Sequence, residues 1–575
     1  MAYGPQYHRL GEDTIAEENK IQQALGWVGK FIRPEIKSLS LVMVLAACMT
    51  GFALAQPYFT KILIDDGLLA GNMDMVIRFA VLIVIMSFVV FAVSGFNRWL
   101  YVGLSGRILF RLREDVYDHL MKLSPAFYGR WRTGDIVSRL DGDVAEVQRF
   151  STDSLLAVVN GSLALIGSLI IMLLLSWQLT LIAFALLPLQ VIFLRRMRPL
   201  VEKGSRILRE KSADVSSFFI ETLPAAKFIQ SLSATGHEQA RLTRLNHGYL
   251  DELLKLQIIN HVTGGVPGLL TGIATACVFV IGGYFVTQGT ATIGTLIAFS
   301  AYMARATGPV QTFLGLYVAY QRAMVSLVRV QALKNQKIAV IDPATPVLIG
   351  GKAQGDLKLD RVSFFYDEAQ ARGVQNISFH IRPGEKILIT GPSGSGKSTL
   401  INLLHRHYDP SAGGLWLDGV SYPDLSLKEL RTIIAVVDQN TILFHGTVRD
   451  NIAYGVKDAI PAQVAAAAKA ARIDAFIESL PQGYDTAIGE RGARLSGGQQ
   501  QRLSIARALL MKPKVLILDE ATSAVDRETE AEFQQMLDQY FADSTRIIIS
   551  HHGGAIRNPD RVFSMRDGRL TEDEA

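Results

Sequence analysis

The chain has 575 residues, 49% of them hydrophobic, and a formal net charge of +5. It is too long for one hydrophobic core, and a mean hydropathy of +0.23 is too apolar for an ordinary soluble enzyme. Its two cysteines do not indicate a disulfide framework. The basic excess lies mostly between long apolar blocks, which favours a membrane protein over a nucleic-acid-binding one.

The first part of the chain is predicted to be a helical membrane domain. Residues 1–16 are polar and expected to be disordered. Residues 17–36 place apolar side chains on one helical face, as in a helix that lies at the membrane interface, anchored by Trp27 and Phe31. Within residues 37–330, apolar blocks of about 20 residues are long enough to cross a bilayer. The six predicted spans, kinked at Pro57 and Pro188, are residues 39–64, 75–100, 155–175, 179–194, 266–286 and 293–318.

Basic residues set the expected orientation. Lysine and arginine are concentrated in residues 101–154 and 195–265, whereas three short connections contain neither: residues 65–74, 176–178 and 287–292. Basic connections face the cytoplasm, so both termini are expected there.

The two basic connections are too long to be simple loops. In the first, Ile108, Leu112, Val116 and Leu120 repeat on one helical face. The membrane helices are therefore expected to continue well into the cytoplasm, with short breaks at residues 127–135 and 221–227.

A linker, residues 331–354, precedes a segment with the rhythm of an α/β domain, residues 355–575. Within it a strand-like run, residues 386–390, leads into a complete Walker A loop: Gly391-Pro392-Ser393-Gly394-Ser395-Gly396-Lys397-Ser398-Thr399. Glycines let the backbone amides face phosphates, and the following helix adds a favourable dipole. Lys397 can reach the β- and γ-phosphates, and the Ser398 hydroxyl can bind Mg²⁺.

Two further motifs follow. The first is Leu495-Ser496-Gly497-Gly498-Gln499, which precedes a basic helix. The second is an apolar run, residues 515–518, that ends in Asp519 and Glu520. This run is expected to be a buried parallel strand that places two carboxylates at the ligand-binding edge of its sheet.

These segments resemble the nucleotide-binding domain of ATP-binding cassette (ABC) transporters, and the whole chain resembles a half-size ABC exporter. The resemblance implies that ATP and Mg²⁺ bind. Tyr366 matches the aromatic that stacks on adenine, and Asp526 belongs to the D-loop. Glu520 matches the general base. His551, with His552 as a competing candidate, matches the histidine near the γ-phosphate. Gln439 matches the Q-loop glutamine, which senses Mg²⁺ and the attacking water. The implied Mg²⁺ ligands are Ser398, Gln439 and Asp519.

The resemblance also implies a dimer, because the signature motif around Ser496 binds ATP held by the opposite cassette. Because every motif is intact, a homodimer is the simpler prediction, and a heterodimer is the alternative. Residues 127–135 and 221–227 resemble the coupling helices of ABC exporters. Residues 488–492 resemble a loop that favours export over import.

We therefore expect ATP-driven export of an amphipathic substrate by alternating access, in the plasma membrane of a bacterium. The alternative is a receptor or channel that the cassette gates without pumping. Arg305, an arginine within the sixth span, hints at an anionic substrate group. The other candidate polar residues of a substrate cavity are Asn97, Arg98, Asn160, Gln190, His261 and Gln311.

Overall fold

The computed structural model describes residues 24–367, 372–489, 495–519, 535–550 and 558–573. The chain divides into two compact units. The first holds the residues up to 117 together with residues 137–333. The second holds residues 118–136 and everything from residue 334 onward. A short piece of the membrane-domain sequence therefore belongs to the cassette unit.

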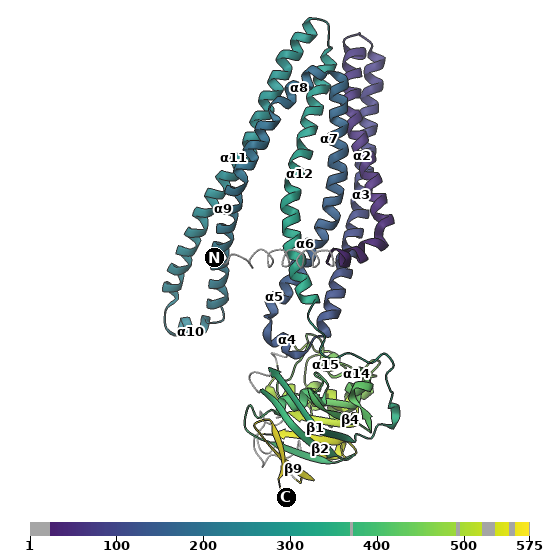
Figure 1. Ribbon diagram of the computed structural model, residues 1–575, viewed down its shortest axis with the longest axis vertical. Coiled ribbons are helices and arrows are strands. Elements are labelled where there is room, and N and C mark those ends of the chain that lie inside the picture. Colours follow the sequence, from purple (N-terminus) through teal and green to yellow (C-terminus); the bar gives the residue numbers. More distant parts are fainter. Residues whose placement is uncertain (1–23, 368–371, 490–494, 520–534, 551–557, 574–575) are drawn as a thin grey trace, which may run out of the picture. The chain divides into compact units, whose positions relative to one another are not determined.

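The first unit is entirely helical in its described residues (Figure 1). Five of its helical segments are long and apolar enough to cross a membrane: Ala24–Leu68, Met73–Met121, Thr133–Leu175, Trp177–Thr222 and Thr235–Thr287. The expected sixth span lies within the 42-residue helix α12 (Ile293–Lys334). All six predicted spans are thus helical, and their number in a membrane stays a prediction.

Several of these helices are far longer than a bilayer requires. Helix α3 (Met73–Met121) has 49 residues and α11 (Thr235–Thr287) has 53. At 1.5 Å per residue they extend about 75 Å, against about 30 Å for a hydrocarbon core. Helix α9 (Leu187–Thr222) packs beside α11, and the short α10 (Ala226–Ser231) connects them (Figure 1). These helices are thus longer than a membrane span requires, as expected, and their extension into the cytoplasm stays a prediction.

The two prolines behave differently from each other. Pro57 lies inside α2 (Ile36–Ile62), as the kinked-span prediction requires. Pro188 lies in the first turn of α9, because α8 (Trp177–Ala185) ends before it and Leu186 separates the two helices. Proline suits a first turn, where its missing N–H has no helical partner to lose. The fourth predicted span is therefore two helices.

A carboxylate joins α2 to α12. After α2 the chain forms a π-helical turn, η2 (Leu63–Leu68), which carries Asp65. The Asp65 carboxylate accepts hydrogen bonds from the Gly294 N–H at 2.8 Å and from the Thr292 hydroxyl at 2.5 Å. It also pairs with Lys61 at 3.2 Å. A Cβ atom at position 294 would lie 2.7 Å from the Lys61 carbonyl oxygen, so this approach requires glycine.

The interfacial helix predicted before the first span packs against α3. Residues 24–32 are helical, with Ala24 and Val28 buried and Leu25 exposed. The Trp27 indole N–H donates to Asp115 at 2.9 Å. Glu35, in the 3₁₀ turn η1 (Arg33–Glu35), pairs with Arg107 at 3.0 Å and with Arg111 at 3.2 Å.

Helices α5 to α7 connect the long α3 to the rest of the first unit. After α5 (Thr133–Ser138) come the π-helical η3 (Arg139–Asp143), α6 (Val144–Arg149), the π-helical η4 (Phe150–Ser154) and α7 (Leu155–Leu175). Within this unit, Arg139 donates to the Arg329 carbonyl of α12 at 2.9 Å, and Ser326 of α12 donates to Asp143 at 2.8 Å.

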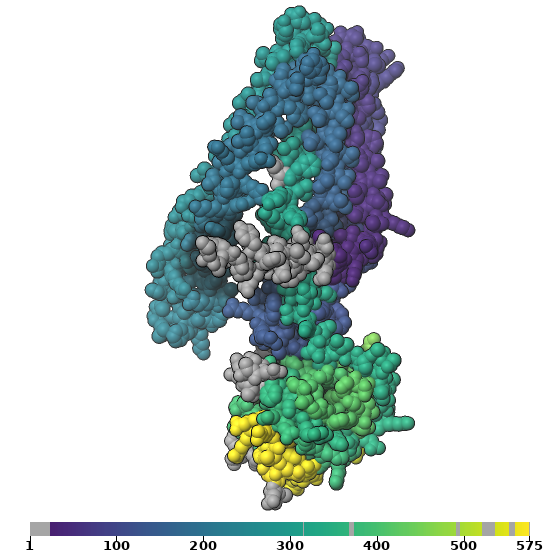
Figure 2. All heavy atoms as spheres, viewed as in Figure 1, coloured from purple at the N-terminus to yellow at the C-terminus, as the bar shows by residue number. Residues whose placement is uncertain are grey.

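Two sheets form the second unit. The larger has the order β10-β9-β3-β8-β7-β6, and its central strands run parallel. The strands are β3 (Lys386–Thr390), β6 (Ile434–Val437), β7 (Val515–Asp519), β8 (Thr545–Ser550), β9 (Arg561–Arg566) and β10 (Arg569–Asp573). The antiparallel β10 lies at the surface of this unit, with mostly exposed side chains (Figure 2).

The smaller sheet is antiparallel, in the order β2-β1-β4-β5. Its strands are β1 (Leu357–Asp367), β2 (Arg372–Ile381), β4 (Ala412–Leu417) and β5 (Val420–Ser421). The described helices of this unit include α13 (Lys397–Leu404), α14 (Leu427–Ile433), α15 (Val448–Ile452), α16 (Pro461–Ala470), α17 (Asp474–Glu478) and α18 (Gly497–Met511).

The larger sheet is buried on both faces. In β3, Ile387 and Ile389 join a core with Leu400 of α13, whereas Leu388 joins a second core with Leu503 of α18. Successive strand residues point to opposite faces, so a continuous apolar run supplies both cores. The predicted strands at residues 386–390 and 515–519 are confirmed.

The first basic connection contributes a short helix to the second unit. Helix α4 (Pro125–Arg130) covers the first four residues of the predicted break at residues 127–135, α5 begins before the break ends, and Phe127 is buried. The Ala126 N–H donates to the Tyr408 hydroxyl of the cassette at 2.7 Å. The residue directly before the predicted coupling helix at residues 127–135 is thus bonded to the cassette within one compact unit, and the coupling role of that helix stays a prediction.

Candidate functional site

The Walker A loop connects β3 to α13. Three of its glycines have positive φ angles: 156° at Gly391, 80° at Gly394 and 110° at Gly396. A Cβ atom at Gly391 would lie 2.3 Å from the Met565 carbonyl oxygen, and one at Gly396 would lie 3.1 Å from that of Gly373. Glycine is therefore required by both conformation and space, and the loop keeps the compact form that cradles phosphates.

Lys397 lies across the mouth of this loop. Its ammonium donates to the carbonyl oxygens of Gly391 at 2.7 Å and Pro392 at 2.9 Å, and the residue is only 6% exposed. The Ser395 hydroxyl is buried in the same loop and has no hydrogen-bond partner among the residues that the structure describes. A buried charge and an unpartnered hydroxyl at a cradle of glycines fit a polyphosphate ligand.

Three strands deliver polar side chains to the edge where this loop lies. In the parallel ladders, Thr390 of β3 pairs with Ser550 of β8, and Ile549 of β8 pairs with Asp519 of β7. The carboxyl ends of these strands therefore meet at one edge of the sheet, and the exposed Ser398 is the second residue of α13, the helix that follows β3. Hydroxyl and carboxylate oxygens suit Mg²⁺, so the described residues fit this ion. Gln439 is exposed two residues beyond the end of β6.

An aromatic cluster borders the Walker A helix. Tyr366 is 43% exposed, and its hydroxyl accepts a hydrogen bond from Asn402 of α13 at 3.2 Å. Its ring centroid lies 5.0 Å from that of Phe364 and 5.4 Å from that of Tyr408, both edge to face. An exposed ring held in this way can stack on a flat aromatic ligand.

The signature motif begins helix α18. Ser496 and Gln499 form a capping box: the Ser496 hydroxyl accepts from the Gln499 N–H at 3.3 Å, and the Gln499 side chain accepts from the Ser496 N–H at 2.9 Å. Ser496 and Gly497 are exposed, whereas Leu495 is buried. The positive end of a 15-residue helix thus faces solvent.

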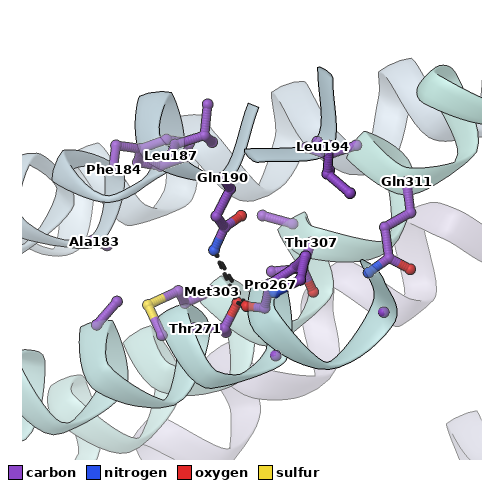
Figure 3. A pocket seen from close by; sticks show the side chains of 15 residues that line it. Ala183, Phe184, Leu187, Gln190, Leu194, Pro267, Thr271, Met303, Thr307 and Gln311 are labelled. Atoms are coloured by element: carbon purple, nitrogen blue, oxygen red, sulfur yellow. Dashed lines mark hydrogen bonds between the residues drawn. The ribbon is translucent and has the colours of Figure 1, made fainter. Parts of the chain in front are cut away.

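A second candidate site is a cavity of about 250 Å³ among α8, α9, α11 and α12 of the first unit (Figure 3). Gln190 points into it and donates to the Thr271 hydroxyl at 3.3 Å and to the Pro267 carbonyl at 3.4 Å. No lining side chain is charged; most are apolar, and Gln190, Thr271, Thr307 and Gln311 are the polar ones. Such a lining suits a molecule with a large apolar body.

Comparisons with known proteins identify both halves of the chain. Residues 39–310 match the family model of the ABC transporter transmembrane region, and residues 374–523 match that of the ABC transporter ATP-binding domain family, described as "ABC transporter". The "Putative multidrug export ATP-binding/permease protein YgaD" of Bacillus subtilis is 32% identical over 94% of each chain. The chain belongs to the ABC transporter family.

Two further relatives refine this assignment. The "ATP-dependent lipid A-core flippase" of Chromobacterium violaceum is 34% identical over 93% of this chain and 91% of its own. A bacterial Atm1-family ABC exporter solved with ATP bound is 27% identical over 94% of this chain, with a TM-score of 0.75. The protein is a half-transporter of the ABC exporter type: an integral membrane protein that binds ATP and couples its hydrolysis to export.

Most of the predicted nucleotide-site residues of the exporter lie in described positions. The Walker A residues, Tyr366, Gln439, the signature residues 495–499 and Asp519 all belong to the second unit. Glu520, Asp526, His551 and His552 lie outside the described residues, and so do residues 490–492 of the exporter-type loop.

The membrane cavity of the exporter contains two of the seven predicted polar residues, Gln190 and Gln311. Arg305 does not line it: its guanidinium donates to the Gln56 side chain at 3.0 Å and so connects α12 to α2. The sequence analysis missed Thr271 and Thr307. A threonine in an apolar helix carries little signal by itself, because its hydroxyl can bond a carbonyl one turn earlier, as Thr271 does with Pro267 at 2.9 Å.

Proposed function

We propose that this exporter works as a homodimer with two ATP sites, each formed by the Walker A loop of one copy and the signature helix of the other. The observation that carries the proposal is the exposed N-terminus of α18 at Ser496 and Gly497. A helix N-terminus favours an anion. The phosphate-binding loop follows β3, on a different element of the same cassette. The helix end is therefore available to a nucleotide that a second copy holds.

Within each site the residues take distinct roles. Lys397 and the amides of its loop bind the phosphates, and Tyr366 stacks on adenine. Ser398, Gln439 and Asp519 hold Mg²⁺, which neutralises charge on the phosphate oxygens. Glu520 accepts a proton from the attacking water, and His551 stabilises the γ-phosphate. Phosphoryl transfer depends mainly on such alignment and charge stabilisation.

An exposed apolar tip supports the dimer. At the turn around α10, Ile220, Leu223, Phe228 and Leu232 are between 62% and 76% exposed. Four large apolar side chains at one helical tip are unfavourable in water and need a protein partner. In a homodimer the second copy supplies that partner, and its identical tip is covered in return.

The cavity of Figure 3 supports an amphipathic substrate with an uncharged, mainly apolar body. Relatives of this exporter carry names that include multidrug export and lipid A-core flipping. Drugs and lipid A-core both have large apolar parts. We place Gln190 and Thr271 in contact with this substrate. Their polar atoms supply the directional hydrogen bonds in an otherwise apolar lining.

The proposed orientation follows from charge. Lysine and arginine are concentrated in the connections that contain α4 and α10, and the other connections lack them. Both termini and the cassette then lie in the cytoplasm, and transport runs outward across the plasma membrane of a bacterium.

Transport in proteoliposomes tests this function. Purified protein is reconstituted with outward-facing cassettes, and uptake of a cationic dye and of a fluorescent phospholipid is measured with Mg·ATP. We expect uptake against a gradient of at least one of the two. Glu520→Gln should abolish uptake while ATP still binds, because the general base is lost.

Two further measurements test the substrate contact at Gln190 and the alternative of a gated channel. Gln190→Ala should weaken stimulation of ATP hydrolysis by the transported probe, whereas Ser94→Ala, which removes a hydroxyl outside the cavity, should not. Dissipation of a preformed gradient on ATP addition, without net accumulation, would instead identify a gated channel.

A further inference from the structure

A second cavity, of about 420 Å³, lies within the cassette unit. One wall comes from residues 121–128, from the end of α3 into α4, and includes Lys122, Ser124 and Tyr128; we call these residues and the predicted coupling helix at 127–135 together the coupling segment. The opposite wall comes from the cassette and includes His407, Leu427 and Arg431. Its volume is in the range of small-molecule sites. Ala339 and Val340 also line the cavity. Because its lining comes from segments that are far apart in the sequence, a ligand here would contact several of them at once.

The charged side chains of this cavity are all basic. Lys122 and Arg431 line it, and no lining residue is acidic. Lys122 pairs with Asp118 at 2.5 Å. Arg431 donates to the Arg406 carbonyl at 3.1 Å; burial lowers the pKa of its guanidinium, and Asp342 partly offsets this. A half-buried guanidinium bonded to carbonyls keeps its full positive charge.

Two histidines lie close to Arg431, and their pKa values show the effect of its positive charge. The rings of His405 and His407 lie 3.2 Å apart, Nδ1 to Nε2. Burial, together with the nearby Arg431, lowers the pKa of His407 to about 4. Burial, His407 and Arg431 lower the pKa of His405 to about 3. Both rings are therefore neutral at pH 7, and the field of Arg431 disfavours a second cation while it favours an anion.

We propose that this cavity binds a small anion, a carboxylate or phosphate group on a short apolar body, between Lys122 and Arg431. Ser124 offers a hydroxyl near the charged group, and Leu427 and Tyr128 contact the apolar part. A ligand with these contacts holds the coupling segment against the cassette. The site thus gives a cytoplasmic anion a way to change how strongly ATP hydrolysis is coupled to transport, independently of the nucleotide and substrate sites.

Binding to the full-length protein in detergent tests the proposal. Saturating non-hydrolysable ATP analogue and Mg²⁺ are present throughout, so that phosphates do not compete for the Walker A loop. The probes are hexanoate, hexyl phosphate, inorganic phosphate, hexanol and hexylammonium, and binding is measured by calorimetry and thermal shift. We expect hexanoate or hexyl phosphate to bind at least tenfold more tightly than hexanol, and hexylammonium not to bind. Inorganic phosphate distinguishes a site for the bare anion from one that needs the apolar body.

Variants locate the binding. Arg431→Gln should weaken it at least tenfold and Lys122→Gln severalfold. Lys428→Gln, an exposed cation on the same helix as Arg431, should leave it unchanged. If Arg431→Gln does not fold, the exposed Lys122 still tests the site. Equal binding of hexanoate, hexyl phosphate and hexanol, or unchanged anion binding in both cavity variants, would overturn the proposal.

Discussion

The backbone N–H of Ala126 donates a 2.7 Å hydrogen bond to the hydroxyl of Tyr408. Through its ring, Tyr408 also contacts Tyr366 edge to face, at 5.4 Å between centroids. A single cassette side chain thus touches both the coupling segment and the aromatic assigned to adenine. If Tyr366 stacks on adenine as proposed, Tyr408 connects the nucleotide site to the residues around α4.

Tyr408→Phe should separate these two contacts. The ring stays in place, whereas the Ala126 N–H loses its acceptor at a cost of about 1 kcal/mol. We expect the ATP concentration for half-maximal hydrolysis to change by less than about twofold, while stimulation by transport substrate falls severalfold. ATPase assays with and without substrate measure both. Tyr540→Phe, at an exposed tyrosine elsewhere in the cassette, is the control. Normal substrate stimulation in Tyr408→Phe would show that the hydrogen bond has no coupling role.

Mixing inactive chains tests the shared ATP sites. Lys397→Ala removes the phosphate-binding ammonium, and Ser496→Arg blocks the signature helix. A mixed dimer keeps one site with both motifs intact, whereas dimers of either variant alone keep none. We expect nucleotide trapping to reappear on co-expression, at up to about one trapped nucleotide per mixed dimer. The absence of trapping in purified mixed dimers would contradict sharing between copies.

The histidine pair predicts a pH dependence of stability. The pKa of His405 is lowered to about 3 and that of His407 to about 4, both from 6.5. The unfolded chain therefore binds protons that the folded chain does not, and the folded state loses up to roughly 1.4 kcal/mol per pH unit per histidine as pH falls from about 6.5 toward 4. Arg431 and Asp342 are the other charged groups that act on this pair or its neighbour.

Thermal unfolding of the full chain between pH 7.5 and 4.5 measures this effect. The variant His405→Gln/His407→Gln should show a shallower fall in its unfolding midpoint than the unsubstituted protein. The difference between the two profiles isolates the histidines from the carboxylates that titrate in the same range. Parallel profiles would mean that the pair contributes nothing.

Arg305 should affect stability more than substrate choice. Its guanidinium donates to Gln56 at 3.0 Å, so Arg305→Ala removes a charge-assisted hydrogen bond between α12 and α2, worth about 1.5–3 kcal/mol. A cycle with Gln56→Ala should show that the two losses are not additive. Arg98→Ala, whose guanidinium lies over the Tyr101 ring, serves as the control. Unchanged stability together with a selective loss of stimulation by anionic substrates would restore the anionic-substrate hypothesis.

Local sequence patterns predicted the elements that depend on neighbouring residues. The Walker A loop between a strand and a helix, the buried strand before Asp519 and the long helices all follow from apolar periodicity, glycine spacing and length. Pro188 marks the limit of this approach. A proline inside an apolar run is compatible with a kink or with a new first turn, and only the packed structure chooses between them.

Sites built from residues that are far apart along the chain could not be predicted from the sequence. Ala126 and Tyr408 are separated by 282 positions, and Gln190 and Thr271 by 81. Nothing in either local sequence indicates the partner, since the contact depends on how whole elements pack. For the same reason the basic cavity around Arg431 was not predicted: its cations come from segments that are unremarkable when read separately.

The Asp65 carboxylate lies in the turn after α2 and caps the start of α12. This contact restricts the number of residues in the turn more than their identity. Substitutions between residues 63 and 68 can leave the carboxylate in place. Inserting or deleting a single residue between α2 and Asp65 would move Asp65 a large part of a turn around the helix axis, because a helical turn takes only about four residues. The carboxylate would then face away from Gly294 and Thr292. In this exporter and in descendants that keep the Asp65 hydrogen bonds, the amino acids of this turn can vary. The number of residues in the turn is expected to stay fixed.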